Sequence, residues 1–380
     1  MLTSKLPNVG MTIFSQMSAL ATEFDAINLS QGFPNFDCSD YLKQQVAYYL
    51  NNGFNQYAPM AGIPQLQQAI AGLVSDHYAL NVNPAEQVTV TSGATEALFV
   101  AIQTLVHSGD EVIVFDPAYD SYEPAVDLAG GKCVHIPLLP PQYGIDWQQV
   151  EDAITVRTKA IIINSPHNPT GAVLGENDIV ALRKLVSEHD IHIISDEVYE
   201  HIVFDGDIHH SILRYPDLAE KSFVTSSFGK TFHVTGWKVG YCIAPKALTD
   251  EFRKIHQYVT FSTVTPIQKA LADMITEAPE LISGLGDFYE QKRDVFSQHL
   301  AGSQFELLPC RGTYFQLLDY SALSDLPDTE FCNWLTKVHK VATIPLSVFY
   351  ETPPDSKVIR VCFAKDEETL KKAAEVLCQV

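Results

Sequence analysis

Short apolar runs alternate along the middle of the chain with longer segments of helical periodicity. Between the runs, apolar residues recur every three or four positions, which predicts helices over 63–74, 95–106 and 177–188 and one more after a capping Asp146. The runs themselves are rich in Val and Ile, which is typical of strands. The predicted strands are QVTVT (87–91), EVIVF (111–115), KCVHI (132–136), KAIII (159–163), IHIIS (191–195) and SFVTS (222–226).

These strands are apolar without a clean alternation, and a helix-length segment follows most of them. That pattern favours an α/β fold with a mostly parallel sheet that is buried on both faces. In such a sheet the carboxyl ends of the strands meet along one edge, where ligands bind.

The pattern changes near residue 275. TYFQLLDY (313–320) and KVIRVCFA (357–364) alternate more regularly, which predicts a smaller, half-exposed antiparallel layer within an α+β unit. We therefore expect a large domain over 36–274 and a small domain over 275–380. Residues 1–35 are expected to form an arm that belongs to the small domain.

Composition narrows the function classes. The chain has 25 basic and 46 acidic residues among its 380, a net charge of -21, so it repels nucleic acid and anionic membranes. We expect no signal peptide and no membrane span, and hence a soluble cytoplasmic protein. The seven scattered cysteines are expected to be reduced. The thirteen histidines show no metal-binding spacing, so we predict no metal site.

Two segments after predicted strands have features of a ligand site. In TSGATEAL (91–98) a strand ends at Gly93 and a helix opens at Ala94 and Thr95, which would suit a phosphate group at the helix N-terminus. An ordinary strand-to-helix turn is the alternative. In FDPAYDSY (115–122), Tyr119 could stack on a flat ring, although simple packing would also explain it.

Two further residues suit a carboxylate. Asn168 in NSPHNPTG (164–171) could donate its amide to a carboxylate or phenolate oxygen, or it could be a turn asparagine. Arg360 lies within the alternating run VIRVCFAK, where a guanidinium should contact an anion such as a substrate carboxylate. A structural ion pair is the alternative for Arg360.

ISDEVYEHI (194–202) places Asp196 at the end of an apolar strand. A buried carboxylate is costly unless a cation accompanies it, and a protonated pyridine nitrogen would be such a cation. Tyr199 could reach a phenolic oxygen on the same ring. The alternative for Asp196 is a helix N-cap.

SSFGKTFHVTGWKVGY (226–241) places Lys230 after the last predicted strand. A partly desolvated lysine is a good imine-forming nucleophile, whereas an isolated lysine is usually a surface residue. Ser227 and Lys238 would add a hydroxyl and a cation for a phosphate. The GKT tripeptide is no P-loop, because the glycine that this motif requires is replaced by Val224.

Taken in order, these segments resemble the fold type I, pyridoxal 5'-phosphate (PLP)-dependent aminotransferases of class I/II, and within them the branch of the methionine aminotransferases and the kynurenine/glutamine transaminases. The resemblance covers nearly the whole chain. It runs through INLSQGFPNFD (27–37), NQYAPMAG (55–62), SGATEAL, FDPAYDSY, NSPHNPTG, SDEVYEHI, SSFGKTFHVTGWKVGY and IRVCFAK.

The resemblance implies a role for each candidate residue. Lys230 would carry PLP, and Asp196 would pair with the pyridine nitrogen. Asn168 and Tyr199 would contact the ring's 3'-oxygen, and Tyr119 would stack on its face. The phosphate would be bound by the segment Gly93, Ala94 and Thr95 together with Ser227 and Lys238. The substrate carboxylate would be bound by Gly32, Asn168 and Arg360.

The resemblance also implies partners and substrates. Tyr57 would reach the phosphate of a neighbouring subunit, which implies a homodimer with shared active sites. Many aspartate-type relatives have an arginine at the position of Lys238. A lysine keeps the positive charge of that arginine but lacks its forked pair of donors. The stretch HQYVTFSTVTP (256–266) lacks the arginine of the dicarboxylate branch and offers Tyr258 and Phe261.

We therefore expect amino transfer from neutral apolar or aromatic amino acids, such as methionine, phenylalanine, tyrosine, glutamine or kynurenine, to a 2-oxo acid. Cysteine-S-conjugate β-elimination with the same cofactor is one alternative. An aminotransferase-like regulator is a more distant one, and neither a DNA-binding module nor a favourable charge accompanies it in the sequence.

Overall fold

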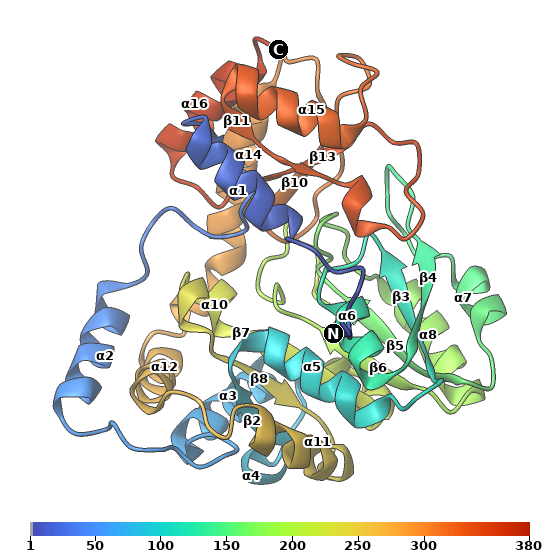
Figure 1. Ribbon diagram of the computed structural model, residues 1–380. Coiled ribbons are helices and arrows are strands. Elements are labelled where there is room, and N and C mark those ends of the chain that lie inside the picture. Colours follow the sequence, from blue (N-terminus) through green and yellow to red (C-terminus); the bar gives the residue numbers. More distant parts are fainter. Residues whose placement is uncertain (1–2) are drawn as a thin grey trace.

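The computed structural model describes residues 3–380 and contains a seven-stranded sheet, ordered β2-β8-β7-β6-β5-β3-β4 (Figure 1). Six of its strands run in the same direction, and β8 alone runs antiparallel to both of its neighbours. The predicted mostly parallel sheet is confirmed. Its strands are β2 (Val88–Thr91), β3 (Glu111–Asp116), β4 (Lys132–Pro137), β5 (Thr158–Asn164), β6 (His192–Asp196), β7 (Ser222–Ser227) and β8 (Gly240–Ile243).

Helices cover both faces of this sheet. Alternate strand residues point to opposite sides, so Val112 and Val114 pack with α5, α6 and α11 while Ile113 packs on the side of α3, α7 and α8. The helices of this part are α2 (Asp40–Asn51), α3 (Pro64–Tyr78), α4 (Pro84–Gln87), α5 (Gly93–Leu105), α6 (Tyr122–Ala129), α7 (Trp147–Ala153), α8 (Glu176–Glu188), α9 (Pro216–Ala219), α10 (Phe228–Thr231), α11 (Lys246–Val259) and α12 (Thr265–Glu277).

A second, antiparallel sheet of four strands lies above the first in Figure 1. Helices α1 and α15 pack against it, and α14 packs against α16. Its elements are β9 (Glu306–Leu307), β10 (Phe315–Asp319), β12 (Ile344–Pro345) and β13 (Val358–Cys362), with α1 (Ile13–Glu23), α13 (Glu280–Ser283), α14 (Leu285–Leu300), α15 (Asp328–Trp334) and α16 (Glu367–Leu377).

The half-exposed character predicted for this layer is wrong. Every residue of β13 is buried, and so is β10 apart from its last residue, Asp319. The reason is that helices cover the sheet while Phe315 and Arg360 face a cavity beside the large sheet, so alternation did not report solvent exposure here.

The N-terminal segment joins the C-terminal part. β1 (Ile27–Asn28) pairs in parallel with β11 (Val341–Ala342), and α1 packs against β11 and β12. The proposed division into 36–274 on one side, and 1–35 with 275–380 on the other, is compatible with these contacts and stays a proposal.

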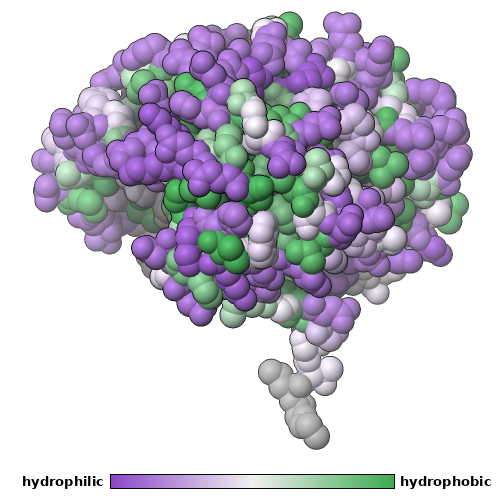
Figure 2. Space-filling view, turned by 90° about the horizontal axis from the view of Figure 1, so that it is seen from above, coloured by the Kyte–Doolittle hydropathy of each residue, from purple (hydrophilic) through white to green (hydrophobic). Residues whose placement is uncertain are grey.

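Figure 2 shows mostly hydrophilic residues around the rim of the face seen from above, with hydrophobic ones gathered nearer its middle. Within residues 3–380, none of the helices has both the length and the apolar character that crossing a bilayer requires.

Candidate active site

A cavity of about 250 Å³ lies where the two sheets meet. The parallel register brings Asn164 at the end of β5 beside Asp196 at the end of β6, and β7 ends next to them at Ser227. Ligands bind at this edge of parallel sheets. The sequence-predicted residues that line the cavity are Gly32, Ala94, Thr95, Tyr119, Asn168, Asp196, Tyr199, Ser227, Lys230, Lys238 and Arg360.

Asp196 is buried without a basic partner. The Tyr122 hydroxyl donates to its Oδ2 at 2.7 Å and the Val198 amide to its Oδ1 at 3.4 Å, and among the described residues no basic side chain comes within ion-pair distance. Burial raises the pKa of Asp196 to about 6. No helix follows directly, so the N-cap alternative is wrong.

Lys230 is half-buried in the short helix α10 rather than on the surface. Its Nζ donates to the Tyr314 hydroxyl at 2.9 Å and more weakly to the Gly32 carbonyl at 3.4 Å. Burial lowers the pKa of this amine to about 8. A fraction of it is therefore neutral near physiological pH and able to act as a nucleophile or a base.

Arg360 is almost fully buried and has no acidic partner. Its guanidinium donates to the Asn168 side-chain oxygen at 2.9 Å and to the Ser30 carbonyl at 3.0 Å, and it lies 4.0 Å over the Phe315 ring. Its Nε is buried without a hydrogen-bond partner. Desolvation lowers the pKa of this group, so an anion that reached it would bind strongly. The structural ion pair considered from sequence is absent within residues 3–380.

The N-terminus of α5 forms a small polar recess. Lys238 donates to the Thr95 hydroxyl at 3.4 Å, and Ser227 accepts from the Gly229 amide. Gly93 has a φ of +77°, and a Cβ on it would lie 3.3 Å from the Lys238 Nζ. Glycine therefore leaves the lysine free to face an anion. Amides at a helix start and a nearby ammonium suit a phosphate.

Two aromatic residues flank the cavity. Tyr119 is half-buried, and burial raises its pKa to about 12. Tyr199 is buried, and desolvation raises its pKa well above the usual range, so both hydroxyls stay protonated. Of the predicted residues, Tyr57 alone lies away from the others: it is 84% exposed and packs edge-on against Phe261.

Three residues in or beside the cavity, of which Asn164 lines it, were not predicted from the sequence. Asn164 donates to the backbone carbonyl of Asp196 at 2.8 Å and accepts from the amide of Asn168 at 2.8 Å. Tyr122 and Tyr314 contact Asp196 and Lys230. Asn164 and Tyr122 belong to NSPHNPTG and FDPAYDSY, so their position beside Asn168 and Tyr119 was the available signal, whereas Tyr314 lies in a segment that was predicted only as a strand.

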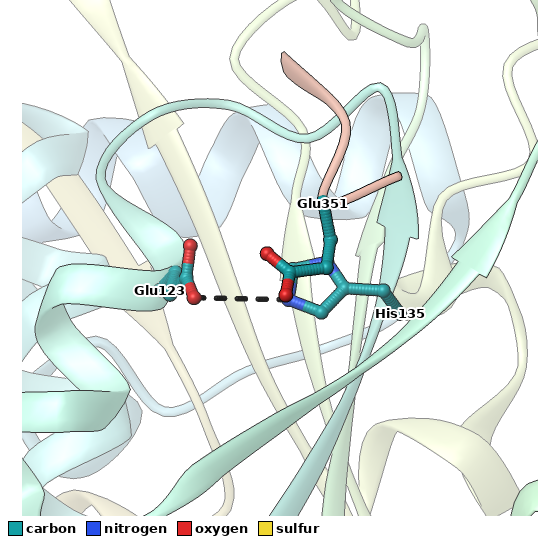
Figure 3. Close-up of side chains that lie close together, drawn as sticks. All are labelled: Glu123, His135 and Glu351. Carbon is teal, nitrogen blue, oxygen red and sulfur yellow. Dashed lines mark ion pairs between the residues drawn. The ribbon is translucent and has the colours of Figure 1, made fainter. Parts of the chain in front are cut away.

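A group of ionisable residues outside this cavity was also not predicted, because its members are far apart in the sequence. Figure 3 shows Glu123 from α6, His135 from β4 and Glu351 facing one another. His135 Nδ1 lies 2.8 Å from the buried Asp116, and its Nε2 lies 3.9 Å from Glu123. Burial opposes protonation, but these acids outweigh it and raise the pKa of His135. Ion pairs of His135 thus join β3, β4 and α6, and the Glu351 amide donates to Asp116 at 2.8 Å.

The chemistry of the residues at the cavity suits PLP. Asp196 lacks a cation and could face a ring nitrogen, Lys230 supplies an amine, and the recess at α5 suits a phosphate. Comparison with known proteins agrees. The family model for aminotransferase class I and II matches residues 25–377.

The chain belongs to this family.

Aminotransferases of class I and II are PLP-dependent, and this chain is a PLP-dependent transaminase. It is 53% identical to the methionine aminotransferase of Escherichia coli over 99% of this chain and 98% of that protein. It is 34% identical to rat kynurenine–oxoglutarate transaminase 3 over 98% of this chain and 88% of that protein.

Solved structures place the fold in the same family. A crystal structure of an E. coli protein identified as having a methionine aminotransferase function superposes with a TM-score of 0.98 at 53% identity, and each chain is covered completely. The N-succinyldiaminopimelate aminotransferase of Mycobacterium tuberculosis superposes with a TM-score of 0.96 at 36% identity, again over both whole chains. The predicted fold type I architecture is confirmed.

Proposed function

We propose that this aminotransferase takes amino groups from neutral amino acids with apolar or aromatic side chains, such as methionine, phenylalanine, tyrosine, glutamine or kynurenine. The observation that carries the proposal is the cavity lining. Its cations are Lys230, Lys238 and Arg360, so Arg360 is its one guanidinium within residues 3–380. With the substrate's α-carboxylate on Arg360, a distal carboxylate would lack a partner. The relatives named for methionine and kynurenine support the same substrates.

We assign Lys230 as the covalent anchor of PLP and Asp196 as the partner of its pyridine nitrogen. Asn168 and Tyr199 would contact the ring's 3'-oxygen, with Tyr119 on its face. The phosphate would lie against Gly93, Ala94, Thr95, Ser227 and Lys238. The assignment is supported by the lining of one cavity, which includes both the Asp196 acid and the Lys230 amine.

The chain's own residues then perform three tasks. Arg360 and Asn168 bind the substrate carboxylate, and the Gly32 backbone adds a contact, which fixes the orientation of the substrate's Cα. The Lys230 amine would hold PLP and, with its pKa lowered to about 8, is suited to remove and return a proton at the substrate's Cα. Asp196 keeps its ionised form beside the ring's positive nitrogen. PLP, when bound, supplies the electron-withdrawing group that makes the Cα proton removable.

A donor comparison tests the substrate class. We expect kcat/KM for methionine, phenylalanine or kynurenine to exceed that for aspartate by about 100-fold, because an unpaired buried carboxylate costs roughly 3 kcal/mol. Amino transfer to a 2-oxo acid is measured for each donor under the same conditions. Aspartate as good a donor as methionine would contradict the proposal. Release of pyruvate and ammonia from a cysteine S-conjugate, measured in parallel, reports β-elimination.

We further propose a cytoplasmic homodimer. Tyr57, Tyr258, Phe261 and Val264 are exposed by 84%, 85%, 46% and 52%, and apolar residues gathered in this way suit an interface. In a dimer Tyr57 would reach the partner's phosphate. Six of the seven cysteines are buried and all are unpaired, which suits a reducing compartment.

Phe261→Asp is expected to weaken self-association by about 30-fold, the effect of losing an interface anchor, and to lower PLP occupancy with it. Sedimentation measures the first effect and absorbance of the bound cofactor the second. Val156→Asp, at a fully exposed position elsewhere, is the matched control. A Phe261→Asp protein that associates like this control would refute the interface.

A further inference from the structure

The amine of Lys230 has one side-chain partner among the described residues, the Tyr314 hydroxyl. The Lys230 Nζ lies 2.9 Å from the Tyr314 oxygen, and that hydroxyl lies 2.6 Å from the Gly32 carbonyl oxygen. The carbonyl can only accept, so the hydroxyl donates its single proton to Gly32. The tyrosine oxygen is therefore turned toward the lysine with a lone pair free.

The Tyr314 ring is held on all sides. It is fully buried, with its centroid 5.2 Å from the Tyr199 ring, 5.4 Å from the Tyr289 ring and 4.9 Å from the Phe315 ring. Such a ring cannot follow a moving amine. Its hydroxyl is thus a fixed point within the cavity wall.

The backbone before Tyr314 is strained in a way that fixes this point further. Thr313 is a β-branched residue with a φ of +68°, a conformation that costs about 1–2 kcal/mol. Its amide donates to the Ile202 carbonyl, and the Phe363 amide donates to the Tyr314 carbonyl, both at 3.0 Å. A strained backbone conformation persists only where surrounding contacts hold it in place, so these contacts also fix Tyr314.

We propose that Tyr314 is a positioning residue that receives the Lys230 amine whenever the lysine is not joined to the cofactor, and so sets where the lysine stands when it moves the proton. This inference rests on the proposed role of Lys230. The tyrosine does not exchange the proton itself, since burial raises its pKa well above the usual range. It contributes a neutral hydroxyl that accepts from a protonated amine and, by rotating its O–H, donates to a neutral one.

The loop at Gly32 shares in this arrangement. A Cβ on Gly32 would come within 2.8 Å of the Phe315 ring, so glycine is needed for the loop to lie close enough for its carbonyl to meet both the tyrosine and the lysine. The Ser30 carbonyl, two residues earlier, accepts from Arg360. The same loop therefore contacts both Arg360, the proposed partner of the substrate carboxylate, and Lys230, the proposed base for the Cα proton.

The test compares Tyr314→Phe with Tyr289→Phe. Each variant loses one buried hydroxyl, and the two rings are neighbours, but among residues 3–380 the hydroxyl of Tyr289 has no hydrogen-bond partner. For Tyr314→Phe we expect kcat to fall about 10- to 100-fold with KM for the amino acid changed less than about threefold, the effect of losing a hydrogen bond to a charged group. Tyr289→Phe should match the wild type.

A second readout does not depend on turnover. The rate at which the cofactor-free, full-length protein takes up added PLP rises with pH as Lys230 becomes neutral. Tyr314→Phe removes an acceptor that stabilises the protonated amine, so this rise should move to lower pH by about one pH unit. Tyr289→Phe should leave it in place. Tyr314→Met, which also lacks the hydroxyl, serves in its stead if the phenylalanine variant does not fold.

The outcomes separate this inference from the proposed function. Unchanged kcat and an unchanged pH profile in the Tyr314 variant would overturn the inference alone. A loss of kcat with no shift of the PLP-uptake profile would assign Tyr314 a merely structural role and would overturn it as well. Full transamination by a protein lacking Lys230 would instead overturn the proposed function.

Discussion

Lys230→Ala is expected to abolish amino transfer, with kcat reduced by at least about 10⁴-fold, the upper range for a lost acid–base group. The reason is that one amine, with a pKa lowered to about 8 by burial, performs both the attachment of the cofactor and the proton movement. Lys238 is expected to be committed to the phosphate, and no other lysine lines the cavity among the described residues. The measurement is single-turnover transfer from methionine to a 2-oxo acid.

Lys292→Ala is the matched control for this loss. Lys292 is also half-buried, but it donates to the Lys365 carbonyl and lies outside the cavity lining. Its replacement should leave kcat within a few-fold of the wild type. Transamination by Lys230→Ala at wild-type rate, with no small amine added, would remove the lysine from the mechanism.

Asp196→Asn is expected to lower kcat by about 150- to 5,000-fold. Asparagine fills the same space and can still accept from the Tyr122 hydroxyl, but it carries no charge to hold a proton on the ring nitrogen. Breaking a buried charge pair costs roughly 3–5 kcal/mol, which corresponds to that range. Steady-state rates with saturating methionine measure the effect. Asp116→Asn replaces another buried aspartate, at the end of β3, which β5 separates from β6; this variant is the control and should retain activity.

Although Asp196→Asn lowers activity, we expect it to raise the free energy of unfolding of the cofactor-free protein at pH 7. The folded-state pKa of Asp196, about 6, lies above its ordinary value of 3.8, so this group destabilises the empty protein as pH rises from about 4 to about 6. Asp196→Asn removes that dependence. At pH 7 the cofactor-free variant should be more stable than the cofactor-free wild type, by at most about 3 kcal/mol. Denaturant unfolding at pH 4 and pH 7 measures the difference, and a variant less stable at both would contradict the burial argument.

The parts of the fold that sequence reasoning reached are those governed by local pattern. The strand KAIII and the helix after Asp146 appear where periodicity and capping placed them, because the Asp146 side chain accepts from the Gln148 and Gln149 amides. The sheet's burial on both faces followed from the absence of alternation. The antiparallel direction of β8 could not be predicted in this way, because the direction of a strand depends on the strands with which it pairs.

In the candidate site, too, residues with a local sequence signal were predicted and residues placed by distant contacts were not. Asp196 was recognisable because an acid at the end of an apolar strand requires a partner. Tyr314 was not, because it lies 84 residues from Lys230 and an aromatic residue in a buried strand is usually core. The burial of β13 was also missed, since alternation cannot distinguish solvent from a ligand cavity on the second face. The group of Glu123, His135 and Glu351 likewise arises from three separate segments.

The central claim is that the amine of Lys230 and the carboxylate of Asp196 bracket one pyridine ring. Reducing the PLP-loaded protein with borohydride fixes the cofactor to whichever amine holds it, and peptide mass mapping then locates the attachment. We expect the added mass on the peptide that contains Lys230 and no added mass on the same peptide of Lys230→Ala. Attachment to another lysine, such as Lys238, in the wild-type protein would contradict the account.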